Sequence, residues 1–305
     1  MSNRSLVHSE SLVDLSLTNH SRGVTSQLSL PRHPLLQYRQ IMSGVTLSLT
    51  GKVALITGGS RGIGAEAVRL FRQAGARVAF NYRSAKAAAD ALSSELGGPE
   101  NCLAVEQELS SPAQGRTLVE ETVRAFWRID ILVANHGVWP PDDASIATMP
   151  EAQWRQTLAI NLDSVFGLTQ AAVAQMQRQG RPSDGSASGH IVFVSSTAGQ
   201  RGEAFHADYA ASKGALISLT KGLSTELAPQ GIYINCVAPG WVETDMSAPA
   251  LADPVTSAKI FATIPLGRVA RPIEVAAPIL FLCTPYAGFM TGEIVNVNGG
   301  AVLVG

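Results

Sequence analysis

From Lys52 onward, short apolar runs alternate with longer segments of helical composition. Runs that are apolar almost throughout are typical of strands in a parallel sheet that helices cover on both faces. The chain therefore predicts an α/β fold: one doubly wound domain with about seven parallel strands. The candidate strands are residues 53–56, 77–80, 103–105, 129–133, 190–194, 233–237 and 294–297, and the candidate helices are residues 62–74, 85–96, 112–126, 151–179, 208–227 and 272–283.

Composition excludes several function classes. The 305 residues are 46% hydrophobic and 15% charged, and the formal net charge is −1, so no basic field would attract nucleic acid or an anionic membrane. No apolar run approaches the roughly 18 residues of a membrane span. The three cysteines lie far apart without metal-ligand spacing, which predicts reduced thiols in a cytoplasmic protein and no metal site.

Residues 1–45 differ from the rest, because they are rich in Ser, Leu, Arg and His and hold only two acids. We interpret them as a disordered extension, or as sequence upstream of a true start at Met42. A transit peptide for an organelle would have a similar composition and remains the alternative. The folded domain is then residues 46–305.

A glycine-rich turn joins the first candidate strand to the next helix, in Thr57-Gly-Gly-Ser-Arg-Gly-Ile-Gly64. Glycines at positions 58, 62 and 64 permit close backbone approach, and the amides at a helix N-terminus attract an anion. A tight turn without a ligand is the alternative. The position between strand and helix favours a site for a dinucleotide pyrophosphate.

The second candidate strand indicates which dinucleotide is bound. A carboxylate at its end would bind the ribose 2′-hydroxyl and repel a 2′-phosphate, but this chain has Asn81-Tyr-Arg83 there. Arg61 and Arg83 are both placed to pair with a phosphate, unless they are merely solvated surface residues. We therefore favour NADP(H) over NAD(H).

Tyr209 and Lys213 are four residues apart on a predicted helix and so share one face. A nearby ammonium lowers the pKa of a phenol, which can then exchange a proton with a carbonyl or alcohol oxygen. Ser196 follows the fifth candidate strand, at the edge where this fold binds ligands, and can hydrogen-bond the same oxygen. Together they predict an oxidoreductase.

From about Leu49 to Gly300 the chain resembles the short-chain dehydrogenase/reductase family, which has a Rossmann fold. The likeness is strongest to 3-oxoacyl acyl-carrier-protein reductases and glucose dehydrogenases. The matching stretches are Thr57–Gly64, Asn161 in Asn-Leu-Asp-Ser-Val-Phe, Ser196, Tyr209–Lys213, Pro239–Thr244, and Pro265-Leu-Gly-Arg with Val297-Asn-Gly-Gly300.

The resemblance implies hydride transfer between a nicotinamide and a ketone or secondary alcohol, with Tyr209 as general acid/base and Ser196 orienting the substrate oxygen. It implies that Lys213 binds the nicotinamide ribose and that Asn161, in a helix break, anchors a water linked to Lys213. The residues expected around the cofactor are Gly58, Ser60, Arg61, Gly62, Ile63, Gly64, Tyr82, Arg83, Glu108, Leu109, Asn135, Gly137, Tyr209, Lys213, Pro239, Gly240, Val242 and Thr244.

The chain departs from the family pattern at three places. The usual Asn-Asn-Ala-Gly after the fourth strand is Ala134-Asn-His-Gly137, and we expect His136 to crowd the cofactor. Glu108-Leu109 replaces Asp-Val, which preserves only a backbone contact to adenine. Asn298 replaces a common Asp. None of these removes a catalytic group.

The substrate is less constrained. The resemblance implies a lid at about 241–265, with Trp139, Glu203 and Phe205 as further cleft candidates. A role in fatty-acid synthesis would need a basic dock for acyl-carrier protein. The helix before the sixth strand has no basic residue at its tip, so Arg178 and Arg181 are the remaining candidates for such a dock. We therefore expect a small carbonyl or alcohol substrate, with acyl-carrier protein as a possible partner.

The resemblance also implies a homotetramer, paired through the helices that carry Asn161 and Tyr209. A nucleotide-binding regulator without catalysis is the alternative from another class. Such a protein would typically have lost one of the Ser, Tyr and Lys, whereas all are present in this chain.

Overall fold

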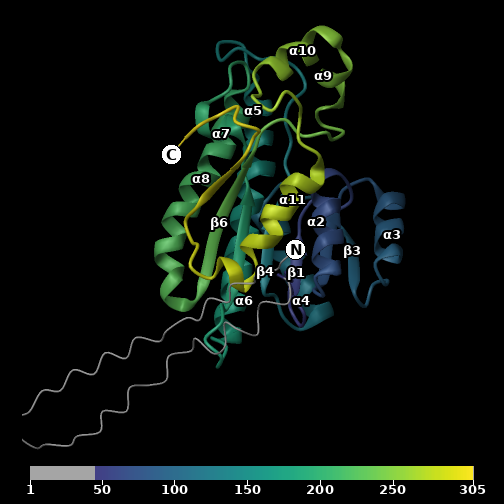
Figure 1. Ribbon diagram of the computed structural model, residues 1–305, viewed down its shortest axis with the longest axis vertical. Helices are drawn as coiled ribbons and strands as arrows, with labels where there is room; N and C mark the ends of the chain where they lie inside the picture. The colour runs from purple at the N-terminus through teal and green to yellow at the C-terminus, as the bar shows by residue number, and fades with distance from the viewer. Residues whose placement is uncertain (1–44, 305) are drawn as a thin grey trace, which may run out of the picture. The chain divides into compact units, whose positions relative to one another are not determined.

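The computed structural model describes residues 45–304 and contains a seven-stranded, all-parallel sheet. The predictions for residues 1–44 lie outside this described part. The strands are β1 (Val53–Ile56), β2 (Arg77–Tyr82), β3 (Cys102–Glu106), β4 (Ile131–Ala134), β5 (Gly189–Val194), β6 (Ile232–Pro239) and β7 (Ile294–Val297). Their order in the sheet is β3-β2-β1-β4-β5-β6-β7, which confirms the predicted doubly wound fold (Figure 1).

The main helices are α2 (Gly62–Gln73), α3 (Lys86–Glu95), α4 (Pro112–Phe126), α5 (Glu151–Leu158), α6 (Ser164–Gln179), α8 (Ala207–Leu227) and α11 (Pro272–Leu282). Shorter ones, absent from the sequence prediction, are α7 (Thr197–Arg201), α9 (Ala248–Ala252) and α10 (Pro254–Ala262). The predicted helix 151–179 is interrupted by a π-helical segment, η2 (Ala159–Asp163). Such insertions are frequent at functional sites.

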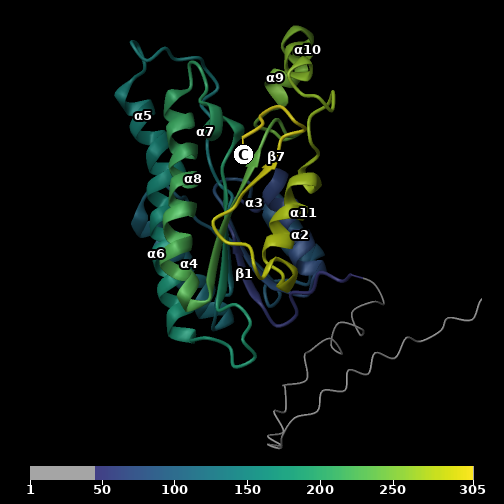
Figure 2. The ribbon, with the colours of Figure 1, turned by 60° about the vertical axis from the view of Figure 1, so that its left-hand side comes forward.

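Two apolar layers bury the sheet. On one face Ile56, Val78 and Val133 pack with side chains from α2 and α11, whereas on the other face Leu55 and Leu132 pack with side chains from α4, α6 and α8. Figure 2 shows α2 and α11 on one side of the sheet and α4, α6 and α8 on the other. Because successive strand residues point to opposite faces, burial on both sides explains why the strands are apolar throughout.

The strand order reverses between β1 and β4, where the chain crosses from one half of the sheet to the other. At such a switch point the loops leaving neighbouring strands diverge and leave a crevice at their carboxyl ends. No helix within residues 45–304 is long and apolar enough to cross a membrane.

Candidate active site

The carboxyl edge of the sheet opens into a cavity of roughly 510 Å³. The cleft candidate Phe205 does not line it and is 54% exposed. Of the predicted catalytic and cofactor residues, Gly64 and Asn161 do not line it, while all the others do. These lining residues are Gly58, Ser60, Arg61, Gly62, Ile63, Tyr82, Arg83, Glu108, Leu109, Asn135, Gly137, Ser196, Tyr209, Lys213, Pro239, Gly240, Val242 and Thr244. The fold thus brings the two predicted motifs together, although they are about 150 residues apart in sequence.

The glycine turn has the backbone that the sequence predicts. Gly58 and Gly62 have positive φ values of 65° and 54°, which other residues rarely adopt. A Cβ on Gly64 would collide with the carbonyl oxygen of Gly58. Arg61 at the start of α2 makes no side-chain cap, so the first amides of this helix remain available to an anion. The turn therefore suits a pyrophosphate.

Asn81, a residue that sequence reasoning passed over, holds this turn in place. Its Oδ1 accepts a hydrogen bond from the Gly58 amide at 2.8 Å, and its Nδ2 donates to the Gln107 carbonyl at 2.8 Å. The side chain is only 4% exposed. A polar residue near the end of an otherwise apolar strand was the available signal.

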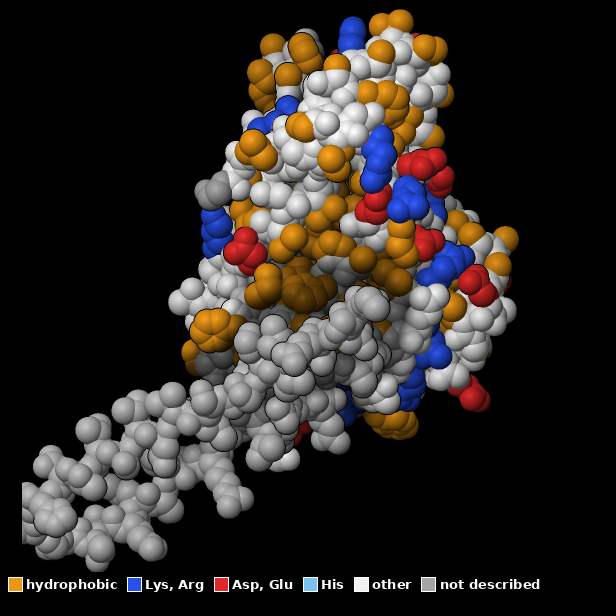
Figure 3. Space-filling model, in the orientation of Figure 1, with side chains coloured by type: hydrophobic (Ala, Val, Ile, Leu, Met, Phe, Trp, Pro, Cys, Tyr) orange, Lys and Arg blue, Asp and Glu red, His pale blue; other side chains and the backbone are white. Residues whose placement is uncertain are grey.

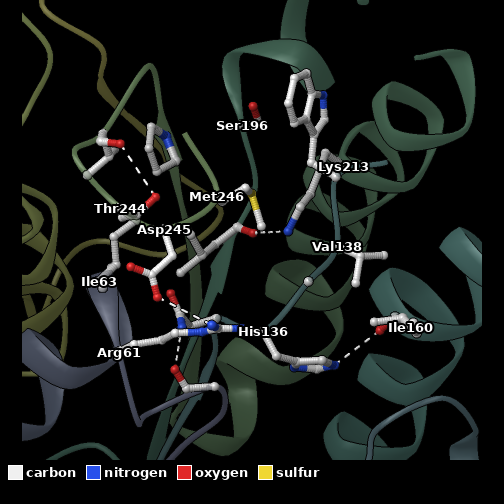
Figure 4. Close-up of a pocket in the computed structure, with 18 of the residues that line it drawn as sticks. Arg61, Ile63, His136, Val138, Ile160, Ser196, Lys213, Thr244, Asp245 and Met246 are labelled. Atoms are coloured by element: carbon white, nitrogen blue, oxygen red, sulfur yellow. Dashed lines mark hydrogen bonds and ion pairs between the residues drawn. The ribbon is translucent and has the colours of Figure 1, made fainter. Parts of the chain in front are cut away.

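The two arginines expected at a 2′-phosphate differ in their surroundings. Arg61 pairs with Asp245 at 3.3 Å across the cavity, as Figure 4 shows, and both side chains are largely exposed. Arg83 is exposed and forms no hydrogen bond or ion pair with any described residue. Arg83 is therefore the freer of the two to meet a phosphate.

Ser196, Tyr209 and Lys213 lie in the same cavity, on the loop after β5 and on α8. The Lys213 Nζ is 5.9 Å from the centroid of the Tyr209 ring. It donates a hydrogen bond to the Val194 carbonyl at 2.8 Å, which Figure 4 marks with a dashed line at Lys213. The Ser195 hydroxyl donates to the Lys213 carbonyl at 2.7 Å, which fastens α8 to the end of β5.

Burial dominates the protonation of this pair. It raises the pKa of Tyr209 to about 12, with the Ser196 hydroxyl lowering the pKa and the Glu203 carboxylate raising it. Burial also lowers the pKa of Lys213 to about 8. The effect expected of Lys213 on the pKa of the phenol stays a prediction.

Asn161 lies at the centre of η2, so the predicted helix break is confirmed. Its Oδ1 accepts from the Val138 amide at 2.8 Å, and its Nδ2 donates to the Val138 carbonyl at 2.9 Å and the Ser212 hydroxyl at 3.1 Å. A Cβ on Gly137 would lie 3.1 Å from the Asn161 Oδ1 and 3.2 Å from the Lys213 Nζ. Glycine at 137 therefore lets these groups approach. The water predicted for Asn161 stays a prediction.

His136 lines the cavity, and its ring is held by hydrogen-bond partners on both sides, so the expectation that it crowds the cofactor stays a prediction. Its Nδ1 lies 2.8 Å from the Thr57 hydroxyl, and its Nε2 lies 2.7 Å from the Ser164 hydroxyl and 3.1 Å from the Ile160 carbonyl. Figure 4 shows the ring directed at Ile160. Burial and the charge of Lys213 lower the pKa of His136 to about 3, so the imidazole is neutral.

Aromatic side chains form the wall beyond Ser196. The Trp139 ring stacks on the His206 ring, with 4.6 Å between the ring centroids, and packs edge to face with Trp241, with 6.2 Å between the centroids. His206 is fixed by its Nε2, which lies 2.9 Å from the Pro140 carbonyl. Glu203 also lines the cavity, and its carboxylate forms no hydrogen bond or ion pair within residues 45–304.

Only the first part of the expected lid, residues 241–247, lines the cavity. The following part forms α9 and α10, where Val255 is 63% exposed and Phe261 39% exposed. Orange side chains gather at the top of Figure 3, where Figure 1 places these helices. The apolar content of this segment is therefore largely at the surface.

Arg178 and Arg181, the candidate dock for an acidic partner, lie at the opposite edge of the sheet. Arg178 is in the last turn of α6, and Arg181 approaches Gly231 just before β6 begins. Both sites precede the amino ends of strands. Within one chain, these arginines cannot serve the cavity mouth. Among the described residues, no group of three or more His, Cys, Asp or Glu could hold a metal ion.

Comparisons with known proteins agree with this geometry. A family model described as enoyl-(acyl carrier protein) reductase matches residues 58–302. A 3-oxoacyl-(acyl-carrier-protein) reductase of Synechocystis is 37% identical over 260 residues, covering 84% of this chain and 99% of that protein. A glucose/ribitol dehydrogenase-type short-chain dehydrogenase/reductase of Brucella melitensis superposes with a TM-score of 0.76 at 33% identity, covering 85% and 100% of the chains. A short-chain dehydrogenase of Burkholderia cenocepacia, solved with NADP, has a TM-score of 0.74 at 31% identity, covering 83% and 98%.

Proposed function

The chain belongs to the short-chain dehydrogenase/reductase family, and we propose that it transfers hydride between NADP(H) and a ketone or secondary alcohol, with Tyr209 as general acid/base. The observation that carries the proposal is a single cavity lined by the glycine turn, Ser196, Tyr209 and Lys213. Its other end holds Arg83, which suits a 2′-phosphate. The bound dinucleotide supplies or accepts the hydride.

The chain's own residues handle the proton. With a pKa of about 12, the Tyr209 phenol is protonated at neutral pH and can donate its proton to the substrate oxygen as the carbonyl is reduced. The Ser196 hydroxyl hydrogen-bonds the same oxygen. Lys213 keeps a positive charge beside the site, and the Asn161 contacts hold the Val138 segment opposite it.

The first substrate to test is a short 3-oxoacyl thioester, since relatives 35–38% identical carry the name of 3-oxoacyl-(acyl-carrier-protein) reductases. Purified protein is given the thioester with NADPH, and with NADH in parallel. We expect faster NADPH oxidation, which the Tyr209→Phe variant loses by a factor of roughly 100 or more. Full activity in Tyr209→Phe would refute the proposed acid, and a preference for NADH would refute the role of Arg83.

A hydroxylated small ketone is the second candidate substrate, and the carboxylate of Glu203 favours it. That carboxylate faces the cavity unpaired, and burial raises its pKa. It can accept a hydrogen bond from a substrate hydroxyl, while Trp139 offers a flat apolar surface. Turnover of polyols with NADP⁺ but not of the thioester would select this candidate.

We propose a homotetramer as the assembly. Phe166 on α6 is 52% exposed, and Leu303 near the C-terminus is 88% exposed, although both are apolar. Light scattering coupled to gel filtration should give four chains, and Phe166→Glu should reduce that number. A wild-type monomer would refute the proposal.

We also propose a cytoplasmic location, supported by Cys102, Cys236 and Cys283, which are buried and unpaired within the described residues. Fractionation of cells that express the full chain would test it, and recovery from an oxidising compartment would contradict it.

A further inference from the structure

His136 occupies a position where the segment after β4 meets two other parts of the site. On one side lies Thr57, at the start of the glycine turn, and on the other lie Ile160 of η2 and Ser164 of α6. The His136 Cα and Cβ also stand 3.2 Å from where a Cβ on Gly58 would lie. The residue therefore touches both the nucleotide turn and the element that carries Asn161.

The hydrogen-bond partners determine the tautomer. The Ser164 hydroxyl donates its single proton to the Ile160 carbonyl at 2.7 Å, so neither neighbour of the His136 Nε2 has a proton to give. Nε2 must therefore carry the hydrogen. Nδ1 then accepts the proton of the Thr57 hydroxyl at 2.8 Å, a shorter contact than the 3.3 Å between that hydroxyl and the Val133 carbonyl. The Thr57 oxygen accepts the amides of Asn135 and of His136 itself. Every polar atom of this cluster is satisfied.

The Ile160 carbonyl explains why such a donor is useful. A π-helical insertion disrupts the regular i to i+4 hydrogen bonds of a helix and leaves a carbonyl in need of another donor. Here Ser164 and His136 supply donors, and the turn they stabilise presents Asn161 to Val138. Gly137, between His136 and Val138, leaves room for the Asn161 Oδ1 and the Lys213 Nζ, which would lie 3.1 and 3.2 Å from a Cβ at this position.

We propose that His136 is a positioning residue, which couples the glycine turn to η2 and holds Asn161 and Lys213 in place, and that it does so as the neutral Nε2–H tautomer. An apolar ring of similar size could fill the same space, but it would leave the Thr57 hydroxyl and the Ile160 carbonyl without these partners. The inference rests on the proposed hydride-transfer function for its kinetic consequences only.

Two variants separate the two sides of the ring. His136→Gln can place an amide near Nε2 and keep the donor to η2, whereas His136→Asn reaches only as far as Nδ1 and keeps the contact with Thr57. We expect His136→Asn to lower kcat with NADPH about tenfold while changing the KM for the carbonyl substrate much less. His136→Gln should stay within about threefold of wild type, although both variants lose a similar part of their thermal stability.

Ser164→Ala provides a matched test from the other side of the contact. It should lower kcat, and combining it with His136→Asn should add little, because both changes break the same link. Equal kcat values for the Asn and Gln variants, or effects of Ser164→Ala and His136→Asn that multiply, would overturn the proposal.

A readout that needs no turnover keeps this inference separate from the proposed function. Nitrogen-15 NMR of the labelled histidines, assigned with His136→Gln, should show a neutral Nε2–H imidazole at neutral pH. An Nδ1–H tautomer or an imidazolium would refute the assignment even if the protein is an active reductase. Conversely, the expected spectrum without reductase activity would leave the hydrogen-bond link standing and refute the function.

Discussion

Two buried asparagines offer a matched pair for testing how the glycine turn is held. Asn81 and Asn235 are 4% and 1% exposed, and each side chain accepts one backbone amide and donates to one carbonyl. Asn81 clasps Gly58 of the nucleotide turn. Asn235 clasps the segment before β7 through Met290 and Glu293, at 2.9 and 3.0 Å, outside the cavity lining.

Replacing either residue with Leu orphans one buried amide and one buried carbonyl. At roughly 1–3 kcal/mol for each unsatisfied group, both variants should lose about 2–6 kcal/mol of unfolding free energy. For a domain of this size, about 2–4 °C of Tm is lost per kcal/mol, so both should melt several degrees lower. Only Asn81→Leu, however, releases the amide of the turn that we propose for the pyrophosphate.

The assay is thermal unfolding with and without NADPH. At a concentration 100 times the Kd, binding adds about 2.7 kcal/mol to the free energy of unfolding, and a tenfold weaker Kd reduces this to about 1.4 kcal/mol. We expect Asn235→Leu to retain the full NADPH-induced shift and Asn81→Leu to lose about half of it. Equal shifts in the two variants would refute the role given to Asn81, whatever their stabilities.

Three further predictions concern the cavity. Gly64→Ala should weaken NADPH binding more than about tenfold, because the added Cβ would collide with the turn. Gly222→Ala should leave the Kd for NADPH unchanged, because a Cβ at this position has no atom within 4 Å. Equal Kd values for the two variants would contradict this prediction. Arg83→Ala should raise the KM for NADPH about tenfold and leave the KM for NADH unchanged. Arg61→Ala should raise the KM for NADPH less, because Arg61 already has an acidic partner in Asp245. Loss of NADH binding in Arg83→Ala would argue against a 2′-phosphate contact. Lys213 has a pKa of about 8 in the folded protein and near 10.5 in the unfolded chain, so the folded state binds this proton less tightly. The unfolding free energy of wild type relative to Lys213→Met should therefore rise by up to about 3 kcal/mol between pH 8 and pH 10.5. Urea unfolding in which this difference stays flat or falls would contradict the buried ammonium.

The sequence predicted the sheet well because buried parallel strands are locally apolar, but its limits are instructive at β4. Residues 129–133 were expected as a strand, whereas the strand is Ile131–Ala134. Ile129 is buried like a strand residue, but it precedes the ladder, and the Asp130 carboxylate accepts the Val53 amide at 2.9 Å. Apolar composition reports burial, and it does not report which backbone groups pair.

The residues of the candidate site were likewise only partly predictable from the sequence. Ser196, Tyr209 and Lys213 were predictable because their spacing is a local motif placed after a strand. The clasp of Asn81 was not, because its partners lie 23 and 26 residues away, and neither was the pairing of Arg61 with a residue 184 positions later. The π insertion at Asn161 has the composition of an ordinary helix, and the surroundings of His136 depend on contacts from the glycine turn and from α6.

The segment between β6 and α11 is closed at its base. The Glu243 amide donates to the Ala270 carbonyl at 2.8 Å, and the Ala270 amide donates to the Trp241 carbonyl at 2.9 Å, so the two ends of the intervening stretch are tied together at the sheet. A loop whose ends are already joined can change length at a cost that grows only with the logarithm of its length. Residues 244–269 therefore form a closed loop whose length can change with little effect on the stability of the sheet.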